Sequence, residues 1–574
     1  MSRILLPVGE DNFELLRKNG SYYVDKTGFI SELLQDSFKV NLITRPRRFG
    51  KTLTMTMLQT FFDIRKDSRS LFQGLEIAGD EKLCSEWMNQ WPVLFLTFKD
   101  VAGNQFSSSY HQLAFCISSL CVEHAYLMDS SRIDSDDRNC FARLKAGTAS
   151  DTEIHNSLFL LTRMMYMHYG KPVILLIDEY DVPLAKASEY GYYREMLDVI
   201  RTIMSSSLKT NIFLQFAVVT GCLRIAKESI FTGTNHFKTN SIAGNRYTDC
   251  FGFTVDEVEQ LLADAGFLSR REAVKHWYDG YRFGEQDLYC PWDVLNYVSD
   301  LDKDPDMLPA NYWKDTSHND IIKRFIGKMG LEINDKLERL LAGGCIKVKV
   351  NEDSDYTLFN NLKDTGQPEF GYSPEVASEE DFWSILYLTG YLTAVKQGED
   401  CEKPEQGEIY LKIPNEEVKT IFQDTIVEWF RKSVKSWDKK ALFSAVWNGD
   451  DGAVTKEMTR LLRRTISYYD YNESFYHAFL AGLFSGAGYQ VESNKEHGEG
   501  RSDVIVKNYE NGQIAVFEVK RSRKREALQR DCEQALKQID DRRYAEEFAE
   551  DYDRVLCFGI AFFRKQCRVL FKQR

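Results

Sequence analysis

A loop that follows a short apolar run and opens a helix is the feature that most limits how this chain can fold. The loop Arg45–Thr52 (RPRRFGKT) lies between the apolar run Val40–Ile43 and the helical pattern Leu53–Phe62. A helix N-terminus presents free backbone N–H groups and the positive end of the helix dipole, so it favours an anion. The order of strand, loop and helix therefore predicts a phosphate site at the edge of an α/β sheet.

The last residues of this loop have the chemistry that a nucleoside triphosphate requires. Gly50 lets the backbone approach phosphate, the Lys51 ammonium reaches the β- and γ-phosphates, and the Thr52 hydroxyl binds Mg²⁺. An arginine stands where such loops usually have their first glycine. The loop carries three arginines in all, Arg45, Arg47 and Arg48. We expect them either to add positive charge beside the phosphates or to bind acidic partners across an interface.

A second apolar run ends in acidic residues. Val173–Ile177 is followed directly by Asp178 and Glu179. At the end of a buried strand, Asp178 is suited to hold Mg²⁺ through water, and Glu179 is suited to polarise the attacking water. A solvated acidic turn is the alternative. The presence of Lys51 and Thr52 upstream favours the catalytic interpretation.

Strand-like and helical segments alternate over the first 250 residues, which predicts a parallel sheet with helices on both faces. Further apolar, β-rich runs are found at 93–98 and 212–219. Thr220 and Arg224 follow the last of these runs and are candidates for sensing the γ-phosphate. A threonine at a strand end can also serve only as a cap.

Length and composition limit the remaining architecture. A chain of 574 residues is too long for one core, and we expect domains at 1–250, 251–465 and 466–574, the middle one mainly helical. The net charge of −13 argues against a wholly basic nucleic-acid-binding surface. Twelve scattered cysteines without CxxC pairs indicate reduced thiols and a cytoplasmic protein. No apolar run approaches the length of a membrane span.

A second group of catalytic residue types lies near the C-terminus. Asp503 precedes an apolar run, the Asn-Gly pair at 511–512 predicts a hairpin, and Glu518 and Lys520 end the returning strand. Residues two apart on a strand share one face, so the hairpin brings both carboxylates and the lysine together. Such a set binds Mg²⁺ and activates water against a phosphodiester. A cross-strand salt bridge is the alternative.

Several motifs resemble the AAA-ATPase-like family. They are Tyr22–Thr27 (YYVDKT), the arginine-rich loop, Leu176–Asp181 (LIDEYD), Trp277–Gly284 (WYDGYRFG) and Pro291–Tyr297 (PWDVLNY). The resemblance implies a P-loop NTPase domain that binds and hydrolyses ATP, found mainly in bacteria and often followed by a nuclease-like domain. For WYDGYRFG we favour a packed aromatic turn over direct ligand contact.

The C-terminal hairpin resembles the PD-(D/E)XK nuclease superfamily. The resemblance implies an α/β nuclease-like domain in which Asp503, Glu518 and Lys520 are catalytic. It also implies supporting helices: Glu473 stands where a leading metal-binding acid is expected, and Gln538 matches a glutamine that often follows.

Basic residues follow the hairpin directly, at Arg521, Arg523, Lys524 and Arg525. Such a run is usually a solvated helix start, but beside a phosphodiester site it favours contacts with a nucleic-acid backbone. The leading hypothesis is an ATP-dependent or ATP-gated, Mg²⁺-dependent nuclease-like enzyme acting on DNA or RNA, which could form homo-oligomers. The alternatives are a nucleotide-switched interaction protein and a machine that remodels protein partners.

Overall fold

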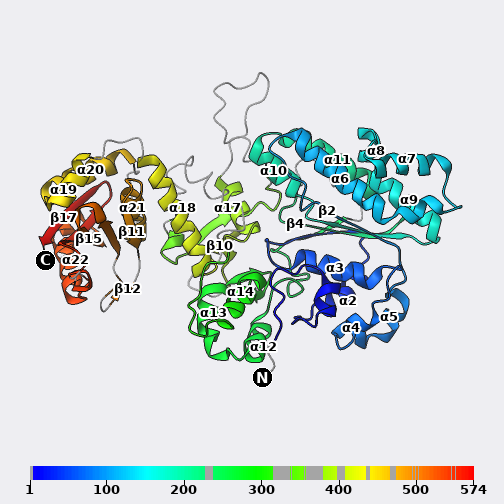
Figure 1. Cartoon of the computed structure of the whole chain (residues 1–574), viewed down its shortest axis with the longest axis horizontal. Coiled ribbons are helices and arrows are strands. Elements are labelled where there is room, and N and C mark those ends of the chain that lie inside the picture. Colours follow the sequence, from blue (N-terminus) through cyan, green and yellow to red (C-terminus); the bar gives the residue numbers. More distant parts are fainter. Residues whose placement is uncertain are drawn as a thin grey trace, which may run out of the picture. The chain divides into compact units, whose positions relative to one another are not determined.

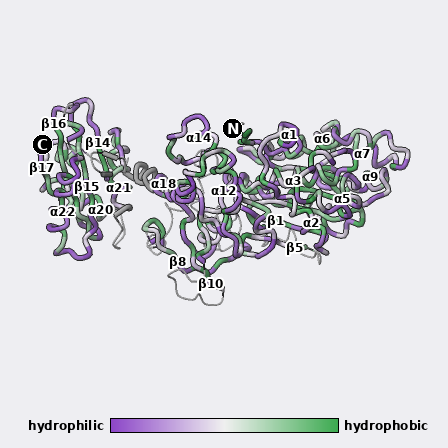
Figure 2. The backbone as a smooth tube through the Cα atoms, turned by 90° about the horizontal axis from the view of Figure 1, so that it is seen from below, coloured by the Kyte–Doolittle hydropathy of each residue, from purple (hydrophilic) through white to green (hydrophobic). Residues whose placement is uncertain are grey.

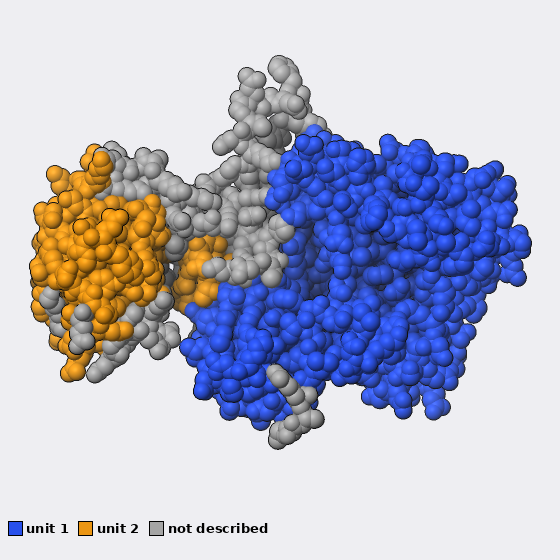
Figure 3. Space-filling model, viewed as in Figure 1, with its two compact units in different colours: residues 1–317, 347–417 blue, residues 318–346, 418–574 orange. Residues whose placement is uncertain are grey.

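The computed structural model describes residues 4–225, 237–313, 336–354, 356, 379–396, 407–434, 440–465, 473–493, 496–497, 500–501 and 503–573, apart from 338, 545 and 550. The chain divides into two compact units, coloured separately in Figure 3. Unit 1 comprises Met1–Ser317 and Lys347–Glu417, and unit 2 comprises His318–Ile346 and Val418–Arg574.

Unit 1 is built on a five-stranded sheet. Its strands are β1 (Val40–Thr44), β2 (Val93–Thr97), β3 (Val173–Asp178), β4 (Leu214–Gly221) and β5 (Phe237–Asn240). They lie in the order β2-β3-β4-β1-β5, and each neighbouring pair is parallel. The predicted parallel sheet is therefore confirmed. Since the strands are parallel, their carboxyl ends share one edge, and β4 separates the strand before the loop from the strand that ends in Asp178.

Helices cover both faces of this sheet, and α3 (Lys51–Phe62) lies on the face opposite α6 (Phe106–Glu123), α9 (Ser157–Tyr169) and α11 (Tyr193–Leu208) (Figure 1). Apolar residues of α3 such as Met55, Leu58 and Phe61 are fully buried. The smaller helices of this region are α1 (Phe13–Lys18), α2 (Gly28–Leu34), α4 (Arg69–Phe72), α5 (Glu81–Trp87), α7 (Ser135–Ala146), α8 (Asp151–His155) and α10 (Val182–Tyr190), with 3-10 turns η1 (Glu76–Gly79) and η2 (Ala125–Asp129).

A mainly helical region follows the sheet, as predicted. It contains α12 (Val255–Ala265), η3 (Leu268–Arg270), α13 (Arg271–Tyr278), α14 (Pro291–Leu301) and α17 (Glu379–Leu388). A core of side chains including Leu261, Tyr278 and Val294 holds the first of these helices together. The region also contains two small sheets: β6 (Tyr281–Phe283) with β7 (Gln286–Leu288), and β8 (Ile346–Lys349), β10 (Glu408–Lys412) and β9 (Thr393–Ala394) in that order.

Unit 2 contains a mixed sheet in the order β11-β14-β15-β16-β17. The strands are β11 (Gln490–Ser493), β14 (Val504–Asn508), β15 (Gln513–Arg521), β16 (Arg554–Phe563) and β17 (Gln566–Gln573), and only β15 and β16 are parallel to each other. Its helices are α18 (Glu416–Val434), whose first residues belong to unit 1, α19 (Lys440–Asn448), α20 (Asp451–Thr465), α21 (Glu473–Ser485) and α22 (Leu528–Asp541).

The remaining short elements of unit 2 are the pair β12 (Glu496–His497) and β13 (Gly500–Arg501) and the 3-10 turns η5 (Tyr509–Asn511), η6 (Arg525–Ala527) and η7 (Glu546–Phe548). The central strands β14, β15 and β16 are rich in buried apolar residues, and apolar segments recur along this part of the chain in Figure 2. Stacked rings of Phe517 and Phe558, with centroids 5.0 Å apart, join β15 to β16. The predicted α/β fold of the C-terminal region is confirmed.

The structure bears on two expectations, one about membrane-spanning segments and one about the state of the cysteines. Within the described ranges, no helix combines the length and the apolar character needed to cross a membrane. Among the described residues, ten cysteines are free thiols. Cys345, however, is disulfide-bonded, so the expectation of uniformly reduced thiols is wrong at this residue. The absence of CxxC spacing excludes only pairs that are close in the sequence.

Candidate nucleotide and nuclease sites

Three hydroxyl groups converge on Asp178 at the carboxyl edge of the unit 1 sheet. Thr52 Oγ1 donates to Asp178 Oδ2 at 2.8 Å, and Thr220 Oγ1 donates to Asp178 Oδ1 at 2.6 Å. Thr97 Oγ1 lies 3.3 Å from Asp178 Oδ2. Asp178 is fully buried. The structure thus brings the loop threonine, the Asp178 carboxylate and the threonine of the intervening strand together through oxygen atoms, the ligand type that Mg²⁺ prefers.

The helix α3 begins at Lys51, directly after the glycine of the loop. Gly50 has a φ of +79° and caps the N-terminus of α3, a conformation that favours glycine. Lys51 is 4% exposed, and its ammonium donates to the carbonyls of Arg45 at 3.1 Å and Pro46 at 2.9 Å. The lysine is therefore folded against the loop itself, at the helix end where an anion would bind.

Glu179 follows the buried strand in a strained backbone conformation. Its φ is +53°, which is unusual for a residue other than glycine, and its N–H donates to Thr220 Oγ1 at 3.4 Å. Burial raises the pKa of Glu179, as do Asp178 and Asp181, while Lys51 opposes the rise. A carboxyl group with a raised pKa beside a phosphate loop is suited to general-base work.

The structure does not support a phosphate-binding role for Arg45. Its guanidinium is fully buried and donates to four carbonyls, those of Thr44 (2.9 Å), Asn240 (2.8 Å), Arg246 (3.0 Å) and Tyr247 (3.0 Å). Burial lowers the pKa of Arg45 to about 10. The donors are committed to the backbone around the end of β5, because Arg45 follows directly on the buried strand β1 and its side chain enters the protein interior.

The other two loop arginines have different surroundings. Arg48 Nη1 donates to the carbonyl of Tyr312 at 2.9 Å, and its guanidinium lies 4.8 Å from the centre of the Trp292 ring. Burial alone would lower the pKa of Arg47, but the neighbouring groups, among them Asp181 and Glu179, raise it overall. Arg47 is therefore the loop arginine that shares its surroundings with the acidic end of β3.

Arg224 forms an ion pair with Asp353, with 3.1 Å between Nη1 and Oδ1, and both side chains are more than a third exposed. It is not brought into the group around Asp178. Asp181, which the sequence interpretation left without a role, holds the segment after β4, because its Oδ2 accepts from the N–H groups of Cys222 and Leu223, each at 3.0 Å.

The aromatic motif supports the loop from within, in agreement with the structural interpretation. Phe49 is fully buried against Tyr281 and Phe283, with ring centroids 5.0 Å away in each case. Gly280 has a φ of +103°, and a Cβ there would lie 2.1 Å from the carbonyl oxygen of Pro414. The motif therefore fixes the loop through packing.

In unit 2 the hairpin forms as the sequence predicts. Val504 pairs with Phe517 in the antiparallel ladder, so Asp503 stands opposite Glu518. Asp503 Oδ2 accepts from the N–H of Val519 at 2.7 Å, and Lys520 Nζ lies 3.2 Å from Glu518 Oε1. Glu518 is 1% exposed. The two carboxylates and the lysine come together on one part of the sheet.

Two residues that the sequence interpretation missed also lie at this site. His477 Nε2, on α21, is 3.1 Å from Asp503 Oδ2. Tyr544 is buried, and burial raises the pKa of its phenol; Gln538 lowers it through a side-chain hydrogen bond, while Glu518 and Asp503 raise it through their charges. Neither residue belongs to a recognisable motif. The only sequence signal for His477 is its position one helical turn after Glu473.

The other residues predicted for the second site differ in how close they lie to the two carboxylates. Glu473 begins α21, and its side chain lies outside the described residues. Gln538, on α22, bonds to Tyr544 and so adjoins the two carboxylates. The basic residues follow the end of β15: Arg521 is half-buried, whereas Arg523, Lys524 and Arg525 are exposed.

Oxygen donors of both sites suit Mg²⁺, but neither site is a closed metal cage. In the part of the chain that the structure describes, one trio of His, Cys, Asp or Glu side chains has all its donor atoms within 4.8 Å of one another, and it is Glu32, Asp249 and Cys250. A metal held by one or two carboxylates keeps several positions for water and phosphate, which is the usual arrangement for Mg²⁺.

Comparison with known proteins shows that each group of residues lies within a matched domain. Residues 7–231 match the model of a family described as a predicted AAA-ATPase, and residues 471–572 match that of the PD-(D/E)XK nuclease superfamily. The chain carries an AAA-ATPase-like domain and a PD-(D/E)XK nuclease superfamily domain. The ATPase-like domain contains the Thr52–Asp178 group, and the nuclease-superfamily domain contains Asp503, Glu518 and Lys520.

A relative extends over both domains. A protein of Azotobacter chroococcum mcd 1, described as "Uncharacterized protein in vnfD 5'region", is 24% identical over 574 residues, covering 98% of this chain and 97% of the relative. The two-domain arrangement is thus matched along nearly the whole length of another protein.

Proposed function

We propose that unit 1 binds ATP with Mg²⁺ and hydrolyses it. The observation that carries this proposal is the hydrogen bond between Thr52 and Asp178, because it joins the end of the phosphate loop to the acidic strand end at one point. In the proposed complex, Lys51 neutralises the β- and γ-phosphates, and Thr52 and Asp178 hold the metal. Arg47 is the loop arginine proposed to face the phosphates.

Glu179 is the proposed base of this reaction. Its raised pKa makes the carboxylate a stronger base towards the attacking water. Thr220 links the two parts, since its hydroxyl donates to Asp178 and accepts from the N–H of Glu179. A change at the γ-phosphate that moves Thr220 would therefore alter the hydrogen bonds of both Asp178 and Glu179.

For unit 2 we propose Mg²⁺-dependent cleavage of a phosphodiester in DNA or RNA. Asp503 and Glu518 would hold the metal, and Lys520 would orient or deprotonate the water. The metal would polarise the phosphodiester and activate that water. The exposed Arg523, Lys524 and Arg525 are proposed to grip the nucleic-acid backbone in a salt-dependent way.

A second candidate function is nucleotide-switched binding without cleavage. The observation that favours it is the ion pair between Lys520 and Glu518, which occupies the lysine and one carboxylate with each other. In this case ATP would control whether unit 2 holds nucleic acid, and the acidic residues would be structural.

One experiment separates these functions in the full-length protein. ATP turnover and cleavage of single- and double-stranded DNA and RNA are measured with Mg²⁺ or Mn²⁺, for the wild type, Lys51→Ala and Asp503→Asn. We expect Lys51→Ala to abolish ATP turnover and Asp503→Asn to abolish cleavage alone. Nucleic-acid binding without cleavage by the wild type under every condition supports the binding function. Undiminished ATP turnover by Lys51→Ala contradicts the nucleotide site.

A further inference from the structure

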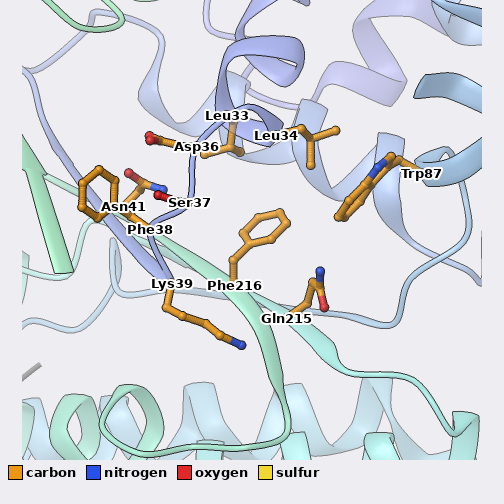
Figure 4. A pocket seen from close by; sticks show the side chains of 10 residues that line it. All are labelled: Leu33, Leu34, Asp36, Ser37, Phe38, Lys39, Asn41, Trp87, Gln215 and Phe216. Carbon is orange, nitrogen blue, oxygen red and sulfur yellow. The ribbon is translucent and has the colours of Figure 1, made fainter. Parts of the chain in front are cut away.

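A cavity of about 280 Å³ lies at the amino ends of β1 and β4, at the edge of the unit 1 sheet opposite the phosphate loop. Its lining comes from the end of α2, the loop that follows α2, the end of α5 and the starts of the two strands (Figure 4). The volume is close to the lower end of the roughly 300–1,000 Å³ range of small-molecule sites. Phe216 in the lining and Thr220 beside Asp178 lie on the same strand, roughly 13 Å apart at about 3.3 Å per residue. The cavity is therefore separate from the proposed nucleotide site.

Two aromatic rings form part of the lining. Phe216 and Trp87 have ring centroids 6.3 Å apart and planes tilted by 46°, and both side chains are half-buried. Leu34 adds an aliphatic surface to the same cavity. Aromatic rings that remain accessible in a cavity offer a stacking surface to a flat ring such as a nucleobase, because every base has a π-face.

Two side-chain amides of the lining have hydrogen-bonding capacity to spare. Asn41 is 1% exposed, and its Oδ1 accepts from Asn240 Nδ2 at 3.4 Å. Among the described residues, the Asn41 Nδ2 group and the Gln215 amide have no hydrogen-bond partner, and both residues line the cavity. A buried N–H without an acceptor costs free energy, which a ligand atom that accepts from it recovers. Asn and Gln amides match the paired donor and acceptor on the edge of a base.

The charges around the cavity are mainly positive. Lys39 lines it, and Lys238 Nζ lies 5.9 Å from the centre of the Phe38 ring, which is also part of the lining. Asp36, the acid of the lining, forms an ion pair with Arg246. Within the described ranges, neither Lys39 nor Lys238 has an acidic partner. The two lysines therefore leave an excess of positive charge, which favours a ligand with an anionic group.

We propose that this cavity binds a nucleoside monophosphate. The base stacks on the rings of Phe216 and Trp87, and the amides of Asn41 and Gln215 pair with its edge. The phosphate lies towards the positive charge of Lys39. One cavity thus supplies the three contacts that such a ligand requires: a stacking surface, unpaired amides and a cation. The site is additional to the proposed ATP site and does not depend on it.

The test titrates AMP, GMP, CMP and UMP into the full-length protein by calorimetry, with Mg²⁺ and a saturating non-hydrolysable ATP analogue present to fill the proposed nucleotide site. We expect at least one monophosphate to bind. Its nucleoside and ribose 5-phosphate should each bind at least about tenfold more weakly, because each lacks one part of the ligand. Asn41→Leu and Gln215→Leu remove an amide at similar size and should each weaken binding about tenfold. Lys39→Gln should weaken monophosphate binding about threefold or more and leave nucleoside binding within about twofold.

A matched control and two outcomes decide the result. Lys82→Gln removes an exposed lysine of α5 outside the cavity and should leave every dissociation constant unchanged. Lys39 is exposed and Gln215 half-buried, so their variants remain informative if the variant of the buried Asn41 fails to fold. Binding of none of the four monophosphates, or wild-type affinity in all the cavity variants that fold, overturns the proposal. Failure of the ATP analogue to bind overturns the proposed nucleotide site alone, because the titrations of wild type and variants can be made without it.

Discussion

Thr52 and Asp178 are 126 residues apart in the chain, and their side chains meet with 2.8 Å between Oγ1 and Oδ2. Thr52 lies in the first turn of the helix after the phosphate loop, and Asp178 ends the strand β3. The contact forms because parallel strands bring their carboxyl ends to one edge of the sheet. It gives unit 1 a compact set of oxygen atoms beside the buried Lys51 ammonium.

The first prediction concerns this contact. Thr52→Val keeps the shape of the side chain but removes the hydroxyl, and Asp178→Asn removes the charge. We expect each to lower Mg²⁺-dependent ATP turnover by about 10²-fold, the scale of losing one electrostatic contact in a transition state. Steady-state turnover at several Mg²⁺ concentrations measures the effect. Wild-type turnover in both variants would show that this edge of the sheet does not hold the metal.

Glu179 provides the second prediction. Glu179→Gln keeps the side-chain shape but cannot accept a proton from water. We expect ATP binding within about threefold of wild type and turnover lowered by about 10²-fold or more. Calorimetric ATP affinity and steady-state turnover separate the two effects. Parallel losses of affinity and turnover would instead mean that Glu179 positions the loop.

Arg45 and Arg224 form a matched pair for the third prediction. Arg45→Met leaves four buried carbonyls without their donor, and we expect it to lower the free energy of unfolding by about 3 kcal/mol or more. Arg224→Ala removes an ion pair exposed to solvent, with an expected cost of about 1 kcal/mol or less. Chemical denaturation measures both. Similar costs for the two variants would contradict the structural role of Arg45.

The fourth prediction concerns a buried pair of acids in unit 1. Burial raises the pKa of both Asp293 and Glu417 above their ordinary values, and the neighbouring Asp293 raises that of Glu417 further. Glu417 Oε1 also accepts from the N–H groups of Tyr312 (2.6 Å) and Trp313 (3.0 Å). The folded state therefore binds more protons than the unfolded state above the ordinary pKa values. The free energy of unfolding should therefore fall as the pH rises from the ordinary pKa values of the two acids towards their raised values.

Glu417→Gln tests this dependence, because the amide keeps an acceptor for the two N–H groups and does not titrate. We expect the variant to show a shallower loss of stability with rising pH than the wild type. Denaturation midpoints from pH 5 to pH 9 measure it. Glu380→Gln, at an exposed position of α17, serves as the control and should keep the wild-type slope. If the stability of Glu417→Gln depends on pH as steeply as that of the wild type, the acid pair is not the cause of the dependence.

The fifth prediction concerns His477. Its Nε2 lies 3.1 Å from Asp503 Oδ2, so we expect it to help position the carboxylate proposed to bind metal. We expect His477→Ala to weaken Mn²⁺ binding by about 10- to 100-fold, the usual cost of losing a group that orients a metal ligand. Calorimetry on the full-length protein measures it without requiring cleavage. His276→Ala, exposed on α13, should leave the Mn²⁺ affinity unchanged. Unchanged affinity in His477→Ala would reduce His477 to a packing residue.

Parts of both sites could be predicted because their signals are local. Gly50, Lys51 and Thr52 act at a helix N-terminus that the neighbouring sequence already defines. The hairpin that sets Asp503 opposite Glu518 depends on two adjacent strands and the turn between them. The spacing of apolar residues and the choice of turn residues are properties of a few consecutive positions. They can therefore be read from the sequence directly.

Other parts depended on side chains from distant segments. The roles of the three loop arginines could not be distinguished, since Arg45 is bound by carbonyls from residues 240–247 and Arg48 by that of Tyr312. His477 could not be identified because nothing in the helix indicates that it faces Asp503.

The sequence by itself determined the parallel sheet, the phosphate loop, the acidic strand end and the C-terminal hairpin, because each follows from local periodicity or turn chemistry. Only the tertiary structure decided that Arg45 is an internal support, that His477 contacts Asp503 and that Asp293 and Glu417 share a buried environment. The reason is physical: burial and pairing depend on which segments pack together, and the partners here come from segments far apart in the chain.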